Sequence, residues 1–132
     1  MKKQTSGQIY RAFKAEDKNT VIRRLNLRMY CKEANVDHTI CENKWLISFE
    51  DVLNHLNPKR YKEHIKPPRL RSKKTAIREW NNHHRKRIKH YIVDCICDSG
   101  KVFVMKHGRY NIINYDELEQ ELIKRLKEKG KY

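Results

Sequence analysis

The stretch KVFVMKHGRYNIINYDELEQELIKRL, residues 101–126, predicts a β-hairpin that runs directly into a helix. Side chains that favour strands stand on both sides of the turn Lys106-His107-Gly108-Arg109, in which Gly108 can take a positive φ. These side chains are Val102, Val104, Tyr110, Ile112 and Ile113. The tip between the two strands is therefore predicted to be tight and basic.

The helix after the hairpin has clear start signals. Asn114 is a good N-cap residue and Glu117 follows three positions later, as in a capping box. Its apolar side chains recur with helical spacing, at Leu118, Leu122, Ile123 and Leu126. This pattern predicts an amphipathic helix that packs on the hairpin.

Two further helices are predicted upstream, over Thr75–His84 and Arg87–Asp98, the second stopped by Ser99-Gly100. The expected order is helix, helix, β-hairpin, helix.

The same order is expected earlier in the chain, because residues 22–56 align with residues 88–122 at a shift of 66 without a gap. Apolar and acidic positions coincide, and Ser48 with Asp51 repeats the capping signal of the second copy. The first copy is predicted to have helices over Gln8–Lys14, Thr20–Ala34 and Ser48–Leu56, and its turn, residues 41–44, has no glycine. The fold class expected is α+β with tandem units, the first one degenerate.

The basic residues are concentrated in one segment of the chain. The sequence has 31 Lys and Arg against 16 Asp and Glu, a formal net charge of +15. Residues 57–90 contain 13 of these cations and two of the acids, while the segments on either side are nearly balanced. Such an excess favours polyanions, usually nucleic acid, so the middle of the chain is the predicted DNA-binding region. Basic residues kept for solubility are the alternative.

Three prolines mark the predicted boundary between the copies. Pro58, Pro67 and Pro68 disfavour helix and extend the backbone before them. We therefore expect a first unit over residues 1–57, a basic linker over residues 58–73 and a second unit over residues 74–132.

The run from Tyr91 to Leu122, with its Gly100-Lys101-Val102 corner, Gly108-Arg109 turn and acid-capped helix, resembles the excisionase-type, MerR-like winged helix-turn-helix family. The resemblance covers about residues 75–126, and the first copy matches by analogy with the second. It implies sequence-specific DNA binding, with the second helix in the major groove and the wing tip on phosphate or the minor groove.

The candidate DNA-binding residues follow from this resemblance and from the charge pattern. From the second copy they are Lys73, Lys74, Arg78, Arg85, Lys86, Arg87, Lys89, His90, Lys106, His107 and Arg109. In the first copy, Arg24, Arg28 and Lys32 recur every four residues with Arg23 beside them. This stripe is either a DNA-facing surface or a solvated helix face.

One feature is at odds with a recognition helix. The segment Arg87–Asp98 is apolar nearly all round, and its polar positions include Asp94 and Asp98. Carboxylates repel phosphates, so only its basic first turn suits DNA. The surplus apolar surface is better explained by packing against the other copy or against a partner protein.

No other chemistry is indicated by the sequence. Cys95 and Cys97 stand two apart on a helix and cannot bind one metal ion together, so we expect no metal and no cofactor, and buried free thiols at Cys31, Cys95 and Cys97. No phosphate loop, nucleophile motif or cluster of metal-binding acids occurs, and no catalytic residue is predicted. No apolar run approaches the ~20 residues of a membrane span and no secretory signal is visible, so a cytoplasmic protein is expected.

The sequence is therefore compatible with two alternative functions. The first is a non-enzymatic DNA-binding accessory protein or regulator of a mobile element, excisionase-like, that prefers duplex over single-stranded DNA. The second is a non-catalytic subunit that docks on a replication or recombination enzyme such as a polymerase, primase or helicase. A monomer is favoured, because two units in one chain can replace a dimer.

Overall fold

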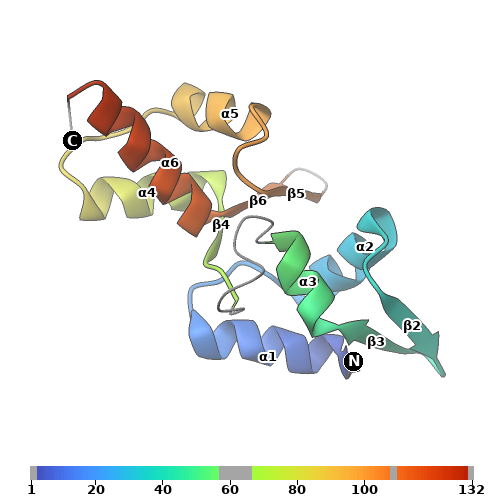
Figure 1. Cartoon of the computed structure of the whole chain (residues 1–132). Helices are drawn as coiled ribbons and strands as arrows, with labels where there is room; N and C mark the ends of the chain where they lie inside the picture. Colours follow the sequence, from blue (N-terminus) through green and yellow to red (C-terminus); the bar gives the residue numbers. More distant parts are fainter. Residues whose placement is uncertain (1–2, 57–66, 108–109, 131–132) are drawn as a thin grey trace. The chain divides into compact units, whose positions relative to one another are not determined.

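The computed structural model describes residues 3–56, 67–107 and 110–130 (Figure 1). Over these residues the protein is α+β, with six helices and two small antiparallel three-stranded sheets. The chain divides into two compact units, Met1–Pro68 and Arg69–Tyr132, each of which is described by itself.

Unit 1 builds its sheet from three short strands in the order β1-β3-β2, with Gln4 opposite Ile47 and Ile47 opposite His38. Its elements, blue to green in Figure 1, are β1 (Lys3–Thr5), α1 (Ser6–Glu16), α2 (Arg24–Ala34), β2 (His38–Cys41), β3 (Lys44–Ser48) and α3 (Phe49–Leu56).

Unit 2 has the same order of elements and the equivalent strand order β4-β6-β5, with Arg71 opposite Ile113 and Ile113 opposite Val104. Its elements are β4 (Leu70–Ser72), α4 (Lys73–His83), α5 (His90–Asp98), β5 (Val104–His107), β6 (Tyr110–Asn114) and α6 (Tyr115–Glu128).

The two units correspond residue by residue with one interruption. The first strand and first helix match at a shift of 67, and everything from the second helix to the start of the last helix matches at a shift of 66. The connection between the first two helices accounts for the change, because residues 17–23 join α1 to α2 while the shorter segment 84–89 joins α4 to α5. The predicted repeat therefore extends upstream to the first strand.

Equivalent hydrogen bonds close both units. The Asp51 carboxylate accepts a bond of 2.8 Å from the Asp37 amide, and the Glu117 carboxylate accepts one of 2.8 Å from the Phe103 amide, 66 positions later. The acid in the first turn of the last helix thus ties that helix to the start of the hairpin. The sequence pattern placed these acids in a capping signal, and in the structure they hold the hairpin in place.

The predicted caps of the last helices are confirmed. The Ser48 hydroxyl accepts from the Asp51 amide at 3.2 Å, and the Asn114 side chain accepts from the Glu117 amide at 3.2 Å. The first helices have caps of the same kind, at Thr5 in unit 1 and at Ser72 in unit 2. A short polar residue with an extended backbone ends the strand and starts the helix at all four places.

Each unit has its own apolar core. Phe13 and Trp80 are fully buried at equivalent positions, on the first helix of each unit. The remaining core of unit 1 is Ile9, Ile22, Leu27, Cys31, Val36, Ile47, Val52, Leu53 and Leu56. That of unit 2 includes Ala76, Ile77, Ile88, Val93, Ile96, Val102, Ile113, Tyr115, Leu118 and Leu122.

The structure differs from the sequence prediction at several boundaries. The first strand of each unit was not expected, and residues 69–73, assigned to the linker, belong to unit 2 because β4 pairs with β6. The second helix of unit 2 begins at His90 and not at Arg87, so its four preceding cations lie in a connection. In unit 1, α2 likewise begins at Arg24, four residues after the predicted start.

The glycine-free turn of unit 1 adopts a left-handed backbone. Glu42 has a φ of 50° and Asn43 a φ of 66°, which are the conformations of a two-residue hairpin turn of type I′. Asn tolerates this region, whereas Glu is strained in it. The hairpin of unit 1 is therefore closed at an energetic cost.

Candidate nucleic-acid interface

The first cation of unit 2 points inward to the acids of α6. The Arg69 guanidinium lies 2.6 Å from Asp116 and 2.9 Å from Glu119, and packs over the Tyr115 ring at 4.8 Å. Burial alone would lower the pKa of Arg69, but its hydrogen bonds with these two carboxylates outweigh burial and raise it. Arg69 therefore holds β4 to α6 and is not free to bind a polyanion.

Arg71 is a second inward cation, and its side chain is 2% exposed. Its Nε donates to Glu79 at 2.9 Å, and a terminal nitrogen donates to the Leu70 carbonyl at 2.9 Å. A buried guanidinium needs such partners, since leaving it unpaired costs several kcal/mol. Among the described part of residues 57–90, Glu79 is the one acid, and it is already paired with the internal cation Arg71.

His84 ends this network at the C-terminal end of α4. Its ring stacks on Trp80 with 3.6 Å between centroids, and its Nε2 lies 3.0 Å from Glu119. Burial would raise the pKa of Glu119, but the bonds from His84 and Arg69 lower it overall. Glu79, Asp116 and Glu119 are therefore all engaged by internal cations.

Six further cations among residues 69–90 project from the surface of unit 2. Each is exposed, and none makes an ion pair with a residue that the structure describes. They are Lys74, Arg78, Arg85, Lys86, Arg87 and Lys89. The first two stand on successive turns of one face of α4, and the other four crowd the connection to α5.

Side chains of α4 hold the backbone of this connection through two hydrogen bonds. The Trp80 indole donates to the Lys86 carbonyl at 2.6 Å, and the Asn81 side chain accepts from the Ile88 amide at 3.0 Å. The Ile88 side chain is buried in the core. A basic loop whose backbone is held in this way loses less backbone entropy on binding.

The connection ends at the N-terminus of α5, where Lys89 is the cap residue and His90 is the exposed first residue of the helix. Free amides at a helix N-terminus attract anions. The cations and the helix end can therefore act on the same phosphate group.

The outer face of α5 is different in character. Tyr91 is 62% exposed, and Asp94, Cys95 and Asp98 are exposed beside it. The Lys73 ammonium group lies 3.1 Å from the Asp94 carboxylate on this face and forms an ion pair with it. The prediction that Cys95 is buried is wrong, because it lies on the outer face of the helix.

The other predicted thiols are shielded. Cys31 is buried and Cys97 half-buried, and burial raises the pKa of each to about 11. Both thiols are therefore held in the neutral form near pH 7.

The predicted basic stripe of unit 1 does not form one open surface. Arg28 is half-buried and its Nε donates to the Ser6 hydroxyl at 3.2 Å, while Lys32 extends over the Trp45 ring at 5.9 Å. Arg23 is exposed, and the Arg24 side chain lies outside what the structure describes. The exposed positions of α2 include two apolar side chains, Leu25 and Met29, which are 59% and 37% exposed.

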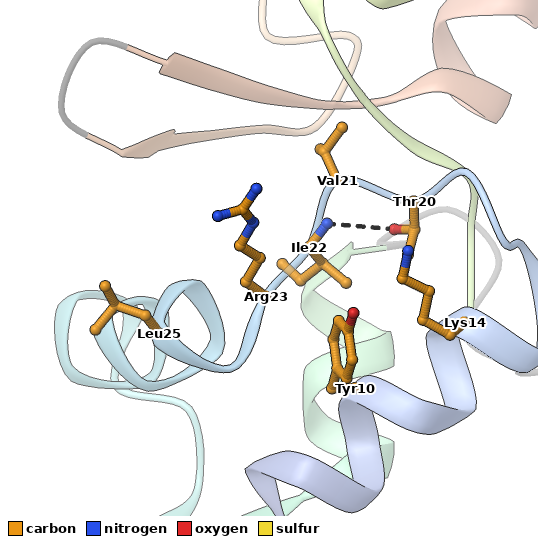
Figure 2. Close-up of a pocket in the computed structure, with 7 residues that line it drawn as sticks. All are labelled: Tyr10, Lys14, Thr20, Val21, Ile22, Arg23 and Leu25. Atoms are coloured by element: carbon orange, nitrogen blue, oxygen red, sulfur yellow. Dashed lines mark hydrogen bonds between the residues drawn. The ribbon is translucent and has the colours of Figure 1, made fainter.

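Unit 1 has a pocket beside its own connection, residues 17–23, which is the equivalent of residues 84–89 in unit 2 (Figure 2). Its volume is about 700 Å³, and its lining is Tyr10, Lys14, Thr20, Val21, Ile22, Arg23 and Leu25. The Thr20 hydroxyl accepts a bond from the Ile22 amide, and Lys14 donates to the Lys18 carbonyl. The lining contains two cations, Lys14 and Arg23, whereas the connection 84–89 of unit 2 contains four.

The wing residues remain a prediction. Lys106 and His107 belong to β5 but their side chains lie outside what the structure describes, as does all of Arg109. Within unit 2, Arg85, Lys86, Arg87, Lys89 and His90 follow one another in the connection and at the start of α5, while Lys74 and Arg78 lie on α4.

No family model, curated protein or solved structure matches the chain. Among residues 3–56, 67–107 and 110–130, no group of three or more His, Cys, Asp and Glu side chains could hold a metal ion. No helix in those ranges has the length and apolar character needed to cross a membrane. The function must therefore be argued from the chain's own residues.

Proposed function

We propose that this chain is a non-enzymatic DNA-binding protein made of two winged helix-turn-helix units, in which unit 2 binds the duplex. The observation that carries the proposal is the connection 84–89, where Arg85, Lys86, Arg87 and Lys89 are exposed on a pinned backbone. Two acids of the same unit, Glu79 and Glu119, are paired with Arg71 and Arg69.

The order of elements supports the winged-helix reading. A helix, a short connection, a second helix, a hairpin and a last helix follow one another in each unit, with the first strand adding to the hairpin sheet. In helix-turn-helix proteins the start of the second helix approaches the bases. Here that start is Lys89-His90, directly after the cations.

The mechanism is phosphate binding with release of counterions. Each neutralised phosphate contributes about 0.9 to the slope of log affinity against log salt for duplex DNA. Four contacts from the connection would therefore contribute roughly 3.6 to that slope. The outer acids of α5 oppose deep entry of that helix into the groove, so backbone contacts dominate over base reading.

The test compares two variants with the same loss of charge. R85A/K86A/R87A/K89A removes the connection cations, while R11A/K18A/K44A/K124A removes four exposed cations elsewhere. Affinity for fluorescent duplexes of random and genomic sequence, and for single strands, is measured over a series of salt concentrations. We expect the first variant to lose most of the affinity, and its slope of log affinity against log salt concentration to fall in magnitude by about 3 to 4. The second variant should stay close to the wild type in both quantities.

Equal losses in the two variants would mean that net charge, and not this connection, drives binding. Unchanged affinity in the first variant would remove the site. A wild-type chain that fails to bind any nucleic acid would end the proposal.

A second candidate function is favoured by the outward apolar residues. Leu25 and Tyr91 are exposed at equivalent positions of α2 and α5, 66 residues apart. Exposed apolar side chains at a repeated position suit a subunit that docks on a larger replication or recombination enzyme. Binding irrespective of DNA sequence, together with a stoichiometric enzyme partner, would favour this candidate; one preferred site in a duplex would favour a regulator of a mobile element.

A further inference from the structure

A second concave site in unit 2 has an apolar floor and a basic rim. It lies between the segment 86–95 on one side and α6 on the other, and its volume is about 450 Å³. Ile92, Leu122 and Leu126 contribute to its floor, with Tyr91 at the edge. The volume is in the range of about 300–1,000 Å³ that is typical of sites for specific ligands.

Every charged residue that lines this groove is a cation. Three of them, Lys86, Arg87 and Lys89, come from the connection, and Arg125 and Lys129 come from the last turns of α6 and its end. Arg125 pairs with Glu121 at 3.1 Å, whereas the other four make no ion pair with a residue that the structure describes. The groove therefore combines partly buried aliphatic side chains with cations on both sides.

We propose that this groove binds an acidic amphipathic helix of a partner protein. Apolar side chains at helical spacing would enter between α5 and α6, and carboxylates on the flanks of the same helix would face the cations of the rim. Binding in a groove by such anchors is a recurring way in which proteins recognise helices.

The chemistry favours a peptide over nucleic acid as the occupant. Phosphates gain nothing from the apolar side chains Ile92, Leu122 and Leu126 of the lining. A neutral apolar ligand would gain nothing from the cations. An acidic, amphipathic segment uses both parts of the lining.

The groove shares Lys86, Arg87 and Lys89 with the proposed DNA site. Duplex DNA and the partner helix would therefore compete for these three side chains, so that docking of the partner releases DNA from unit 2. Lys129 and Leu126 belong to the groove alone, which allows the two activities to be separated.

The probe is a fluorescent 16-residue peptide with leucines at alternating spacings of three and four and glutamates between them. Its controls are a peptide of the same composition in an order that destroys the apolar stripe, and a peptide with lysine in place of glutamate. Binding to the full chain is followed by anisotropy, with the random duplex titrated in parallel. We expect the striped acidic peptide to bind and both controls to bind at least about tenfold more weakly.

Two variants locate the site. Leu126→Ser should weaken the peptide by about tenfold, and Lys129→Glu by about fivefold, because an anchor contact and a rim charge are lost. The surface variant Lys129→Glu keeps the test valid if Leu126→Ser impairs folding, which circular dichroism reports. Both variants should bind duplex DNA with an affinity within about twofold of that of the wild type. Excess peptide should displace duplex DNA from the wild-type chain.

The proposal is overturned if the scrambled peptide binds as well as the striped one, or if no peptide binds at millimolar concentration. It is also overturned if the chain forms dimers that Lys129→Glu dissociates, since the groove would then receive a second copy. Failure of duplex binding with intact peptide binding would remove the DNA function and leave this inference standing.

Discussion

The two units differ most where they first fail to align, in the connection between their first two helices. Both connections bury an isoleucine at the same place, Ile22 and Ile88. The connection of unit 1 carries Asp17, Lys18 and Arg23, whereas that of unit 2 carries four cations and no acid. The buried residues fix the path of the chain, and the exposed ones determine what the unit can bind.

A second difference lies inside the units. The buried pair Arg71–Glu79 of unit 2 corresponds to Gln4 and Ala12 in unit 1, which form no ion pair. The same architecture is thus built with and without a buried ion pair. Removing one partner should be costly, while removing both should copy unit 1.

The largest predicted effect is therefore that of Glu79→Ala. It leaves the Arg71 guanidinium buried without this carboxylate and should lower the free energy of unfolding of unit 2 by about 3 kcal/mol. The double variant R71Q/E79A should recover much of this loss. The indole N–H signals of Trp45 and Trp80, one in each unit, report the two unfolding transitions separately in a urea titration followed by NMR.

Glu33→Ala on the exposed surface of unit 1 is the control for the loss of an acid, and it should change either transition by less than about 0.5 kcal/mol. A double variant that is no more stable than Glu79→Ala would show that the two units do not tolerate the same substitution.

A smaller effect is expected at the turn of unit 1. Replacing Glu42-Asn43 with Asn-Gly supplies the residues that a type I′ turn prefers and should stabilise unit 1 by about 0.5–1 kcal/mol. The Trp45 signal should move to higher urea and that of Trp80 should not. Glu42→Ala, which keeps a side chain in the left-handed region, is the control and should give no such gain; an equal gain would contradict the strain assigned to the turn.

The smallest effect is a difference in acid sensitivity. The pKa of Glu119 is lowered in the folded state, so its contribution to stability is complete above its ordinary value of 4.5 and is lost as the pH falls through the folded pKa. Unit 1 has Leu53 at the equivalent position. Urea midpoints of unit 2 should therefore decline more between pH 5 and 3 in the wild type than in Glu119→Gln, and identical declines would exclude this carboxylate as a cause.

Local chemistry made the last helices predictable from the sequence. Ser48 and Asn114 are caps because a short polar side chain accepts from a free amide in the first turn of the helix, whatever the rest of the fold is. The hairpins were equally local, since strand-forming residues flank a short turn in both copies. The concentration of charge was also visible, because it requires only counting.

What could not be predicted depends on contacts between distant segments. The strands β1 and β4 have three residues each, too few for an alternating pattern, and exist because β3 and β6 offer them an edge. Arg69 and Arg71 contribute to the positive charge of residues 57–90, but the charge count does not reveal that their partners lie in α6 and α4. On α2 the buried side is centred on Leu27 and Cys31, whereas Leu25 is exposed, and this division depends on contacts with the rest of unit 1.

The bond between the acid of the last helix and the start of the hairpin spans 14 residues in each unit. Both sheets also close within their own half of the chain, since no strand of one unit pairs with a strand of the other among the described residues. All the segments of the unit 1 core precede residue 57. During synthesis, the first unit can thus fold without waiting for contacts from the second.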